Sequence, residues 1–342
     1  MRRRHWALVL ATWVVAACAD VGPAEPGGNL APPAELYLSG ALDIMQDNSV
    51  KKHETDWVAF REAAFSDANG ARTLADTHPA IVAALERLGD GHSFFVSPGA
   101  QPALSPAMSA ALAPGPVAAD PRAEMVLPGI GYVDVPAFSG GGPVADDLAR
   151  VYHQIIESVD TLELTCRWIV DIRGNTGGNM WPMVAGVGPV LGEDTLGFFV
   201  DPDSVVDAWI YQSGQSGLDD FVIVDVETPY ELRYPSPWVA ILTDSLTASS
   251  GEAVAVAFRG RPRARSFGEG TWGVSTANAA FPLSDGAVIF LTVSTMADRL
   301  GSIYGGELIP DEFILGGAKT GDPASDEVLA AALEWLSLQQ CS

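Results

Sequence analysis

The sequence has few cysteines. Three cysteines in 342 residues exclude a disulfide framework. Cys18 ends an apolar leader, so only Cys166 and Cys341 remain for one optional bridge, and the sequence leaves its formation open. An H-E-x-x-H segment and a cluster of cysteine and histidine are both missing from the chain, so we expect neither a metal nor a cofactor.

Basic residues are also scarce. Lysine and arginine number 19 against 43 aspartates and glutamates, which gives a formal net charge of −24. This balance argues against nucleic acid and anionic lipid surfaces as partners. Hydrophobic residues make up 48% of the chain, which is enough for a substantial core and argues against disorder.

The first 18 residues are typical of a secretory signal. Three arginines precede an apolar stretch and small residues that end at Cys18. Residues 15–18 resemble a bacterial lipobox, whose cysteine becomes the lipid-bearing first residue of the mature protein; an ordinary signal cut near Ala17 is the alternative. We expect an exported lipoprotein of the bacterial cell envelope, periplasmic or at the cell surface, and a flexible Pro/Gly/Ala-rich tether over residues 19–33.

The rest of the chain divides by its apolar patterning. Residues 34–96 carry helical periodicity, with Pro79 and Gly89 bracketing the third helix. Residues 97–123 are rich in alanine and proline and indicate a linker or covering loop. Strand and helix patterns alternate over residues 124–340, which predicts a layered α/β core domain.

Ser249 lies between an apolar strand and a predicted helix. Ser249 and Glu252 fit a capping box, which explains the serine without any chemistry. The same position would direct the first amides and the positive end of the helix dipole at an oxyanion forming beside Ser249. A G-x-S-x-G elbow is missing, which argues against an α/β-hydrolase. Ser249 is therefore both a cap and a candidate nucleophile.

A nucleophilic serine needs a base. Lys51 and Lys52 lie in a polar helical segment, and Lys319 lies in a Gly-rich loop near the end of the chain, so a serine–lysine dyad is not available. Among the histidines, His92 follows the turn at Asp90 and precedes an aromatic strand, where its ring could face a cleft. A structural role for a lone histidine in a turn remains the alternative.

A Gly-rich turn follows the strand that ends near residue 172. The amides of Gly177 or Gly178, together with that of Ser250, could hold a developing negative charge. The polar side chains that precede these glycines are expected to brace the turn rather than react; they are Asp171, Arg173 and Asn175.

Six ordered segments carry a family resemblance: DGHSFF, GYVDVPAF, VDIRGNTGG, TDSLTASSGE, GEGTWG and GELIPDE. Over about residues 80–315 they resemble the serine peptidase superfamily of C-terminal processing (tail-specific) proteases, the tricorn core and the interphotoreceptor retinoid-binding protein modules. The resemblance implies a crotonase/Clp-like β-β-α core, with a small N-terminal helical region here. It also implies hydrolysis of a peptide or protein substrate, with Ser249 as the nucleophile.

Two departures from the family pattern guide the expected mechanism. Val274 stands where processing proteases carry their lysine, and the tricorn-like branch instead uses a histidine and a glutamate, matched here by His92 and Glu307. Glu307 would orient His92 directly or through a hydroxyl. The 97–123 linker is too short for the PDZ domain of processing proteases. A binder of an apolar or peptide ligand and an esterase or amidase remain alternatives on the same fold.

Overall fold

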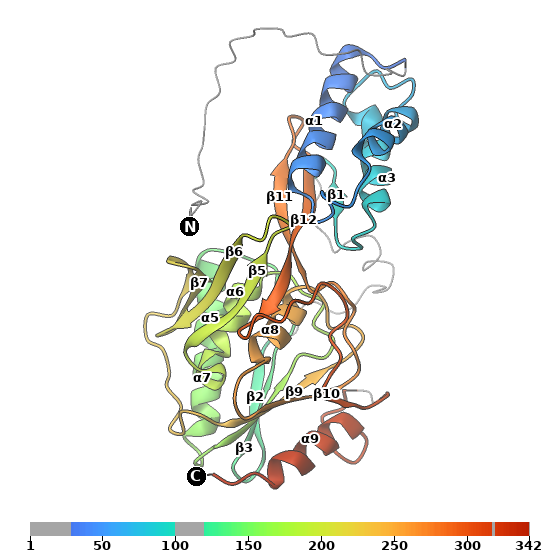
Figure 1. Ribbon diagram of the computed structural model, residues 1–342. Coiled ribbons are helices and arrows are strands. Elements are labelled where there is room, and N and C mark those ends of the chain that lie inside the picture. The colour runs from blue at the N-terminus through green and yellow to red at the C-terminus, as the bar shows by residue number, and fades with distance from the viewer. Residues whose placement is uncertain (1–28, 100–119, 317–318, 342) are drawn as a thin grey trace.

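The computed structural model describes residues 29–99, 120–316 and 319–341. Figure 1 shows an elongated molecule, with helices α1 to α3 at one end, the main core at the other, and the long strands β11 and β12 running between them. The predicted leader, the lipidation site at Cys18, most of the predicted tether and most of the linker lie outside the described residues.

The N-terminal helices form where the sequence predicts them. They are α1 (Pro32–Asn48), α2 (Trp57–Asp67) and α3 (His78–Leu88), with a short 3-10 turn at Ala75–Thr77. Gly89 ends α3 in the left-handed conformation, with φ at 69°. The apolar faces of the helices pack on Ile289 and Leu291, so the helical region has its own core around one end of a long hairpin.

That hairpin belongs to a seven-stranded antiparallel sheet. Its strands are β1 (Phe94–Val96), β5 (Asp194–Val200), β6 (Val206–Gln212), β7 (Gln215–Leu218), β8 (Phe221–Asp225), β11 (Thr276–Pro282) and β12 (Val288–Asp298). The order is β1-β12-β5-β6-β7-β8, and β11 pairs with β12. We did not predict strands β5 to β8.

The second sheet has six strands in the order β13-β10-β9-β4-β3-β2. The strands are β2 (Arg122–Leu127), β3 (Ile130–Asp134), β4 (Arg167–Asp171), β9 (Trp238–Thr243), β10 (Ala264–Gly268) and β13 (Glu312–Phe313). Strands β3, β4, β9, β10 and β13 run parallel, and β2 is antiparallel to β3. The first two residues of β2 fall inside the stretch predicted to be a linker.

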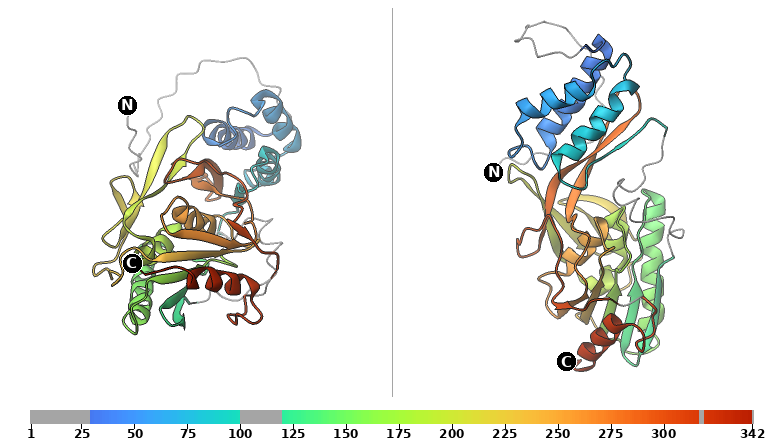
Figure 2. Two further views of the ribbon diagram at one scale, coloured as in Figure 1. Left: turned by 60° about the horizontal axis from the view of Figure 1, so that its bottom comes forward. Right: turned by 90° about the vertical axis from the view of Figure 1, so that its right-hand side faces the viewer.

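Helices cover both faces of the parallel strands. Val170 and Ile241 face α5 (Pro143–Asp160), α6 (Met180–Gly186), α7 (Gly188–Leu191) and α8 (Ser250–Phe258). The alternate residues Ile169 and Leu242 face α9 (Glu327–Ser337). Figure 2 shows α5 along one side of the core and α9 at its lower end. The predicted α/β class is confirmed.

The chain ends close to the start of β4. Cys166 and Cys341 form a disulfide with their Cα atoms 5.8 Å apart, which resolves the pairing that the sequence left open. Within the described ranges, no helix combines the length and apolar composition needed to cross a membrane.

Candidate active site

Ser249 occupies a strained turn between β9 and α8. Its φ of 52° lies in a region that residues other than glycine rarely adopt, and such a conformation costs of order 1–3 kcal/mol. Its N–H donates to the Glu252 carboxylate at 2.8 Å, which is the cap interaction that the sequence predicts. The first amides of α8 follow directly, so the positive end of the helix dipole lies at Ser249.

The loop that carries Ser249 is bonded to the Gly-rich turn after β4. Four hydrogen bonds join the two segments, and each of them involves at least one backbone group. They are Gly174 N–H to Asp244 Oδ1 (2.9 Å), Thr247 Oγ1 to Ile172 O (3.0 Å), Ala248 N–H to Asn175 O (2.9 Å) and Ser250 Oγ to Gly178 O (2.7 Å). The Ser249 loop and the glycine turn therefore form one unit.

The two glycines of the turn differ in what their amides can do. A Cβ on Gly177 would lie 2.8 Å from the Ser249 Cβ, so only glycine fits beside the serine. The Gly177 N–H already donates to Asn175 Oδ1 at 2.9 Å. Of the two glycine amides considered as oxyanion donors, that of Gly178 is the better candidate, together with the Ser250 amide at the start of α8.

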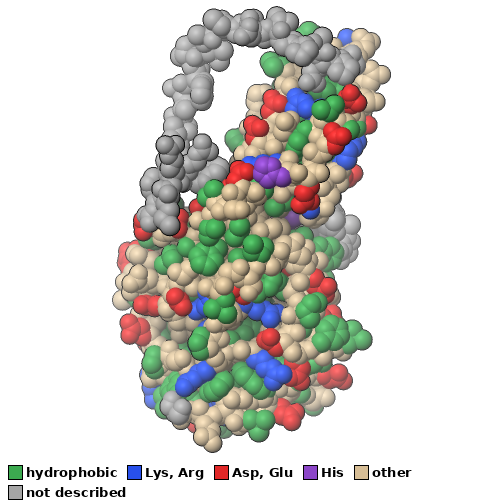
Figure 3. Space-filling model, viewed as in Figure 1, with side chains coloured by type: hydrophobic (Ala, Val, Ile, Leu, Met, Phe, Trp, Pro, Cys, Tyr) green, Lys and Arg blue, Asp and Glu red, His purple; other side chains and the backbone are tan. Residues whose placement is uncertain are grey.

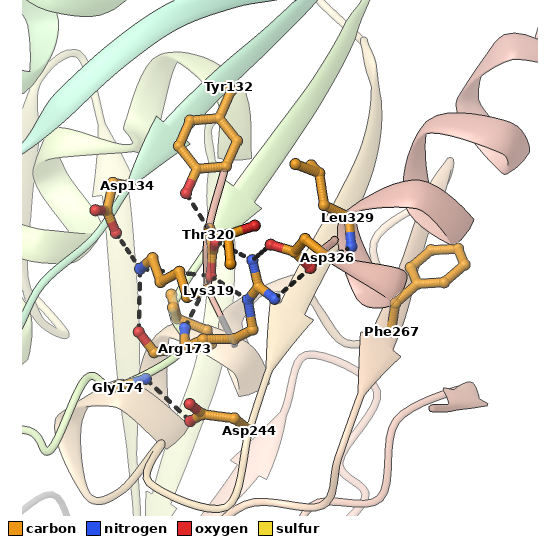
Figure 4. Close-up of polar contacts among 12 residues, drawn as sticks. Tyr132, Asp134, Arg173, Gly174, Asp244, Phe267, Lys319, Thr320, Asp326 and Leu329 are labelled. Atoms are coloured by element: carbon orange, nitrogen blue, oxygen red, sulfur yellow. Dashed lines mark hydrogen bonds and ion pairs between the residues drawn. The ribbon is translucent and has the colours of Figure 1, made fainter. Parts of the chain in front are cut away.

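A buried ion network braces the glycine turn, as the sequence predicts. The Arg173 side chain is 2% exposed and bonds both Asp171 and Asp326, with all four N–O distances between 2.8 and 3.0 Å. Tyr132 donates its hydroxyl to Asp171 at 2.7 Å. Figure 4 shows Arg173 beside Asp326, whose carboxylate also accepts from the Leu329 N–H of α9. The start of the turn is therefore fixed to β3 through Asp171 and Tyr132 and to the first turn of α9 through Asp326.

Lys319 belongs to this network. Its ammonium group donates to Asp134 Oδ1 at 2.5 Å and to the Arg173 carbonyl at 3.1 Å. The peptide between Arg173 and Gly174 is therefore held on both sides, by Lys319 at its carbonyl and by Asp244 at its N–H (Figure 4). These contacts place Lys319 as a brace, which agrees with the exclusion of a serine–lysine dyad.

His92 is buried at the start of β1, only 6% exposed. Its Nδ1 lies 2.8 Å from Thr276 Oγ1, and its backbone bonds Asp90 Oδ1 (2.9 Å) and Asn278 Nδ2 (2.9 Å). Burial lowers the pKa of His92 to about 4, against the opposing effect of Asp90. The imidazole is therefore neutral at pH 7, which is the form that a general base requires.

Glu307 lies at the surface beside the same region. The Glu307 carboxylate lies so close to Gly270 that a Cβ at position 270 would overlap it. The Glu307 backbone lies close to Gly273. Among the described residues, no hydrogen bond joins His92 directly to Ser249 or to Glu307. The hydroxyl beside His92 is that of Thr276, which the sequence did not single out because a threonine in a strand carries no signal of its own.

Acidic side chains are spread over the face shown in Figure 3, from the helices to the core. On the described part of this face the lysines and arginines lie as separate spots rather than as one basic surface. The arrangement agrees with the net charge of −24.

Known proteins are similar to this chain in sequence or in fold. A nisin-resistance protein from Lactococcus lactis subsp. lactis is 27% identical over 313 residues, which cover 91% of this chain and 89% of that protein. The structure of a lipoprotein from Streptococcus agalactiae matches with a TM-score of 0.68 at 21% identity, over 90% of this chain and 96% of that one. The photosystem II D1 C-terminal processing protease matches with a TM-score of 0.57 at 18% identity, over 85% and 96%.

The family comparison covers the core domain. Residues 129–312 match peptidase family S41, a range that contains the glycine turn, Ser249 and Glu307 and lies within the segment that carried the sequence resemblance. The predicted superfamily and its fold are confirmed. The chain belongs to peptidase family S41 and is a serine peptidase that acts on a peptide or protein substrate.

Proposed function

We propose that Ser249 and His92 carry out the hydrolysis. Ser249 Oγ attacks the peptide carbonyl, and His92 takes the proton of the hydroxyl and passes it to the leaving amine. The C–N bond breaks as the acyl-enzyme ester forms, and a water activated by the same imidazole then releases the acid. The observation that carries the proposal is Ser249 itself, held at a φ of 52° at the start of α8 and beside the glycine turn.

The contacts of His92 support its role as the base. With the Nδ1 hydrogen donated to Thr276 Oγ1, the lone pair of Nε2 is left to accept the proton of Ser249. Catalytic hydrogen bonds are often long in proteins without substrate and shorten when substrate binds, so a direct bond to Ser249 is expected in the complex.

The amides of Gly178 and Ser250 are proposed to hold the oxyanion. Both amides belong to the unit that the Ser249 loop and the glycine turn form through their hydrogen bonds. Within this unit, Ser250 Oγ donates to the Gly178 carbonyl at 2.7 Å. One such donor contributes about 10²–10³ to kcat in known serine peptidases.

Glu307 is proposed as the third member of the site, acting at a distance from the imidazole. Its neighbours Gly305 and Gly306 bond Ser275 Oγ at 2.8 and 2.6 Å, and Ser275 precedes the Thr276 that contacts His92. Glu307 would therefore support the imidazole through this segment and its hydroxyl rather than by direct contact.

We further propose export and lipidation at Cys18 in a bacterial envelope. The likeness to a streptococcal lipoprotein supports this location, and a Cys18→Ala variant should move from the membrane to the soluble fraction. The name of the lactococcal relative makes nisin a first substrate to test.

The test is a cleavage assay read by mass spectrometry. The purified protein is incubated with nisin and with a peptide library, in parallel with Ser249→Ala, His92→Ala, Glu307→Gln and the control Ser158→Ala, which changes an exposed serine of α5 outside the site. Cleavage by wild type and Ser158→Ala, lost in Ser249→Ala and His92→Ala and weakened in Glu307→Gln, is the expected result. Unchanged cleavage by Ser249→Ala would reject the proposal.

A further inference from the structure

Glu252 makes more contacts than a helix cap needs. It lies in the first turn of α8 with 0% of its surface exposed. A capping box accounts for one of its bonds, the one from the Ser249 N–H. Three further donors come from a segment about twenty residues later in the chain. They are Thr271 Oγ1 (2.5 Å), Gly273 N–H (3.1 Å) and Val274 N–H (3.0 Å).

Each carboxylate oxygen of Glu252 accepts two of these hydrogen bonds, and those at Oε2 join two segments of the chain. Oε2 accepts from both Ser249 and Val274, so one oxygen lies between the nucleophile's backbone and the later segment. Oε1 accepts from Thr271 and Gly273. Thr271 is itself held by Leu308, through Thr271 N–H to Leu308 O (3.2 Å) and Leu308 N–H to Thr271 Oγ1 (2.9 Å).

The later segment leads directly to the partner of His92. The Thr276 N–H donates to the Val274 carbonyl at 2.7 Å, and Thr276 Oγ1 lies 2.8 Å from His92 Nδ1. A continuous path of short contacts therefore runs from Ser249 through Glu252, Val274 and Thr276 to His92.

We propose that Glu252 is a positioning residue that fixes the Ser249 loop relative to His92. The inference rests on the function proposed above for Ser249 and His92. Glu252 acts through the Ser249 backbone and through the segment of residues 271–276, and it does not touch the substrate. A misplacement of about 1 Å between reacting groups lowers the rate by about 10²-fold, so a loosened link should lower kcat more than it changes KM.

The link depends on the charge of the carboxylate. All four contacts of Glu252 are donors, so a proton on either oxygen must displace an N–H or turn the Thr271 hydroxyl away. Burial raises the pKa of Glu252 to about 7, against the lowering effect of the four donors. The titratable groups on the neighbouring segments are Asp244 on the Ser249 loop, Glu269 before Thr271, Glu307 beside Gly273 and His92 beyond Thr276. The other residues of α8 are uncharged.

The experiment measures kcat and KM from pH 4 to 9 for wild type, Glu252→Gln and two variants of Thr271. Wild-type kcat should fall as the pH drops through about 7. Glu252→Gln should lose about 10²-fold in kcat at pH 8, with KM within about threefold, and should lack the decline near pH 7. In that variant the remaining decline should follow the pKa of His92, near 4.

The Thr271 variants keep the test valid if Glu252→Gln does not fold. Thr271→Val removes the hydroxyl that lowers the pKa of Glu252, so its decline in kcat should move to higher pH. Thr271→Ser keeps the hydroxyl and should restore the wild-type profile. Asp298→Asn is the matched control, since Asp298 is also a buried carboxylate that accepts two backbone N–H groups and a hydroxyl; its profile should stay unchanged.

Two outcomes would overturn the inference. One is a folded Glu252→Gln with wild-type kcat and pH profile, and the other is a Thr271→Val profile that does not move. Activity that survives in Ser249→Ala would instead reject the proposed function, so the two failures are distinguishable.

Discussion

Replacing Arg173 with methionine would show how strongly the buried ion network holds the glycine turn. The guanidinium contacts two carboxylates, Asp171 and Asp326, which have 0% exposed side chains. Methionine has a similar length and cannot pair with either. Lys319 remains 3.6 Å from Asp171, so Asp326 is the carboxylate that the substitution leaves without a basic partner among the residues that the structure describes.

The loss in the free energy of unfolding depends on whether Asp326 stays charged or becomes protonated in the variant. Burial alone would raise the pKa of Asp326, and the bonds from Arg173 hold it below 3.8. Without Arg173 the group must lie buried and charged or take up a proton. Protonation at pH 7 of a group with an ordinary pKa costs about 4 kcal/mol, at 1.36 kcal/mol for each pH unit. This agrees with the roughly 3–5 kcal/mol found when one partner of a buried pair is removed.

The stability lost in Arg173→Met should depend on pH. Protonation of Asp326 becomes easier as the pH falls, so the loss in the free energy of unfolding should shrink from about 4 kcal/mol at pH 7 to about 1.5 kcal/mol at pH 5. Urea unfolding followed by circular dichroism measures this loss.

Arg265→Met is the matched control for that measurement. Arg265 pairs with Glu312 at 3.0 Å with both side chains about 40% exposed, so its loss should cost under about 1 kcal/mol. A cost below about 1 kcal/mol for Arg173→Met, or a cost that does not change with pH, would refute the reasoning.

Three further substitutions test packing and a buried histidine. A Cβ on Gly251 would lie 2.5 Å from the Asn175 carbonyl, so Gly251→Ala should lower stability by about 1–3 kcal/mol, whereas Gly40→Ala meets nothing within 4 Å in α1 and should raise it by about 0.5–1 kcal/mol. Thermal unfolding compares the two, and equal effects would contradict the packing argument. His153 accepts from the Tyr230 N–H (2.8 Å) and donates to the Ala185 carbonyl (3.0 Å), and burial lowers its pKa below 6.5. Because the unfolded chain binds this proton more readily, stability should fall as the pH drops below 6.5, and His153→Gln, which offers one acceptor and one donor, should weaken that dependence. Identical pH profiles for the two proteins would show that His153 does not contribute.

The sequence predicted those elements whose burial follows a regular pattern. Strands β4 and β9 are buried almost throughout, and helices α5 and α9 place apolar residues at helical spacing, so local periodicity was enough. Strands β5 to β8 are partly exposed, and β7 reads QSGL, which has neither an apolar run nor alternation. Their pairing is decided by contacts between strands, which a single sequence does not display.

The residues of the candidate site also differ in how far the sequence predicted them. Ser249 and the glycine turn each have a local signature, because a strand that leads into a turn and a helix is visible in the sequence. The contact between His92 and Thr276 joins residues 184 apart, and no pattern predicted it. Glu252 matched a capping box, and that local explanation concealed the three donors that lie 19 to 22 residues further along the chain.

Covalent labelling would identify the serine that attacks the substrate. The purified protein, residues 19–342, is treated with a fluorophosphonate, and the adduct is located by peptide mass spectrometry. A single adduct on Ser249, formed by wild type and Ser158→Ala and absent from Ser249→Ala and His92→Ala, is the expected result. An adduct on another residue, or none between pH 8 and 9 where His92 is neutral and Glu252 is largely ionised, would show that Ser249 is not the activated serine.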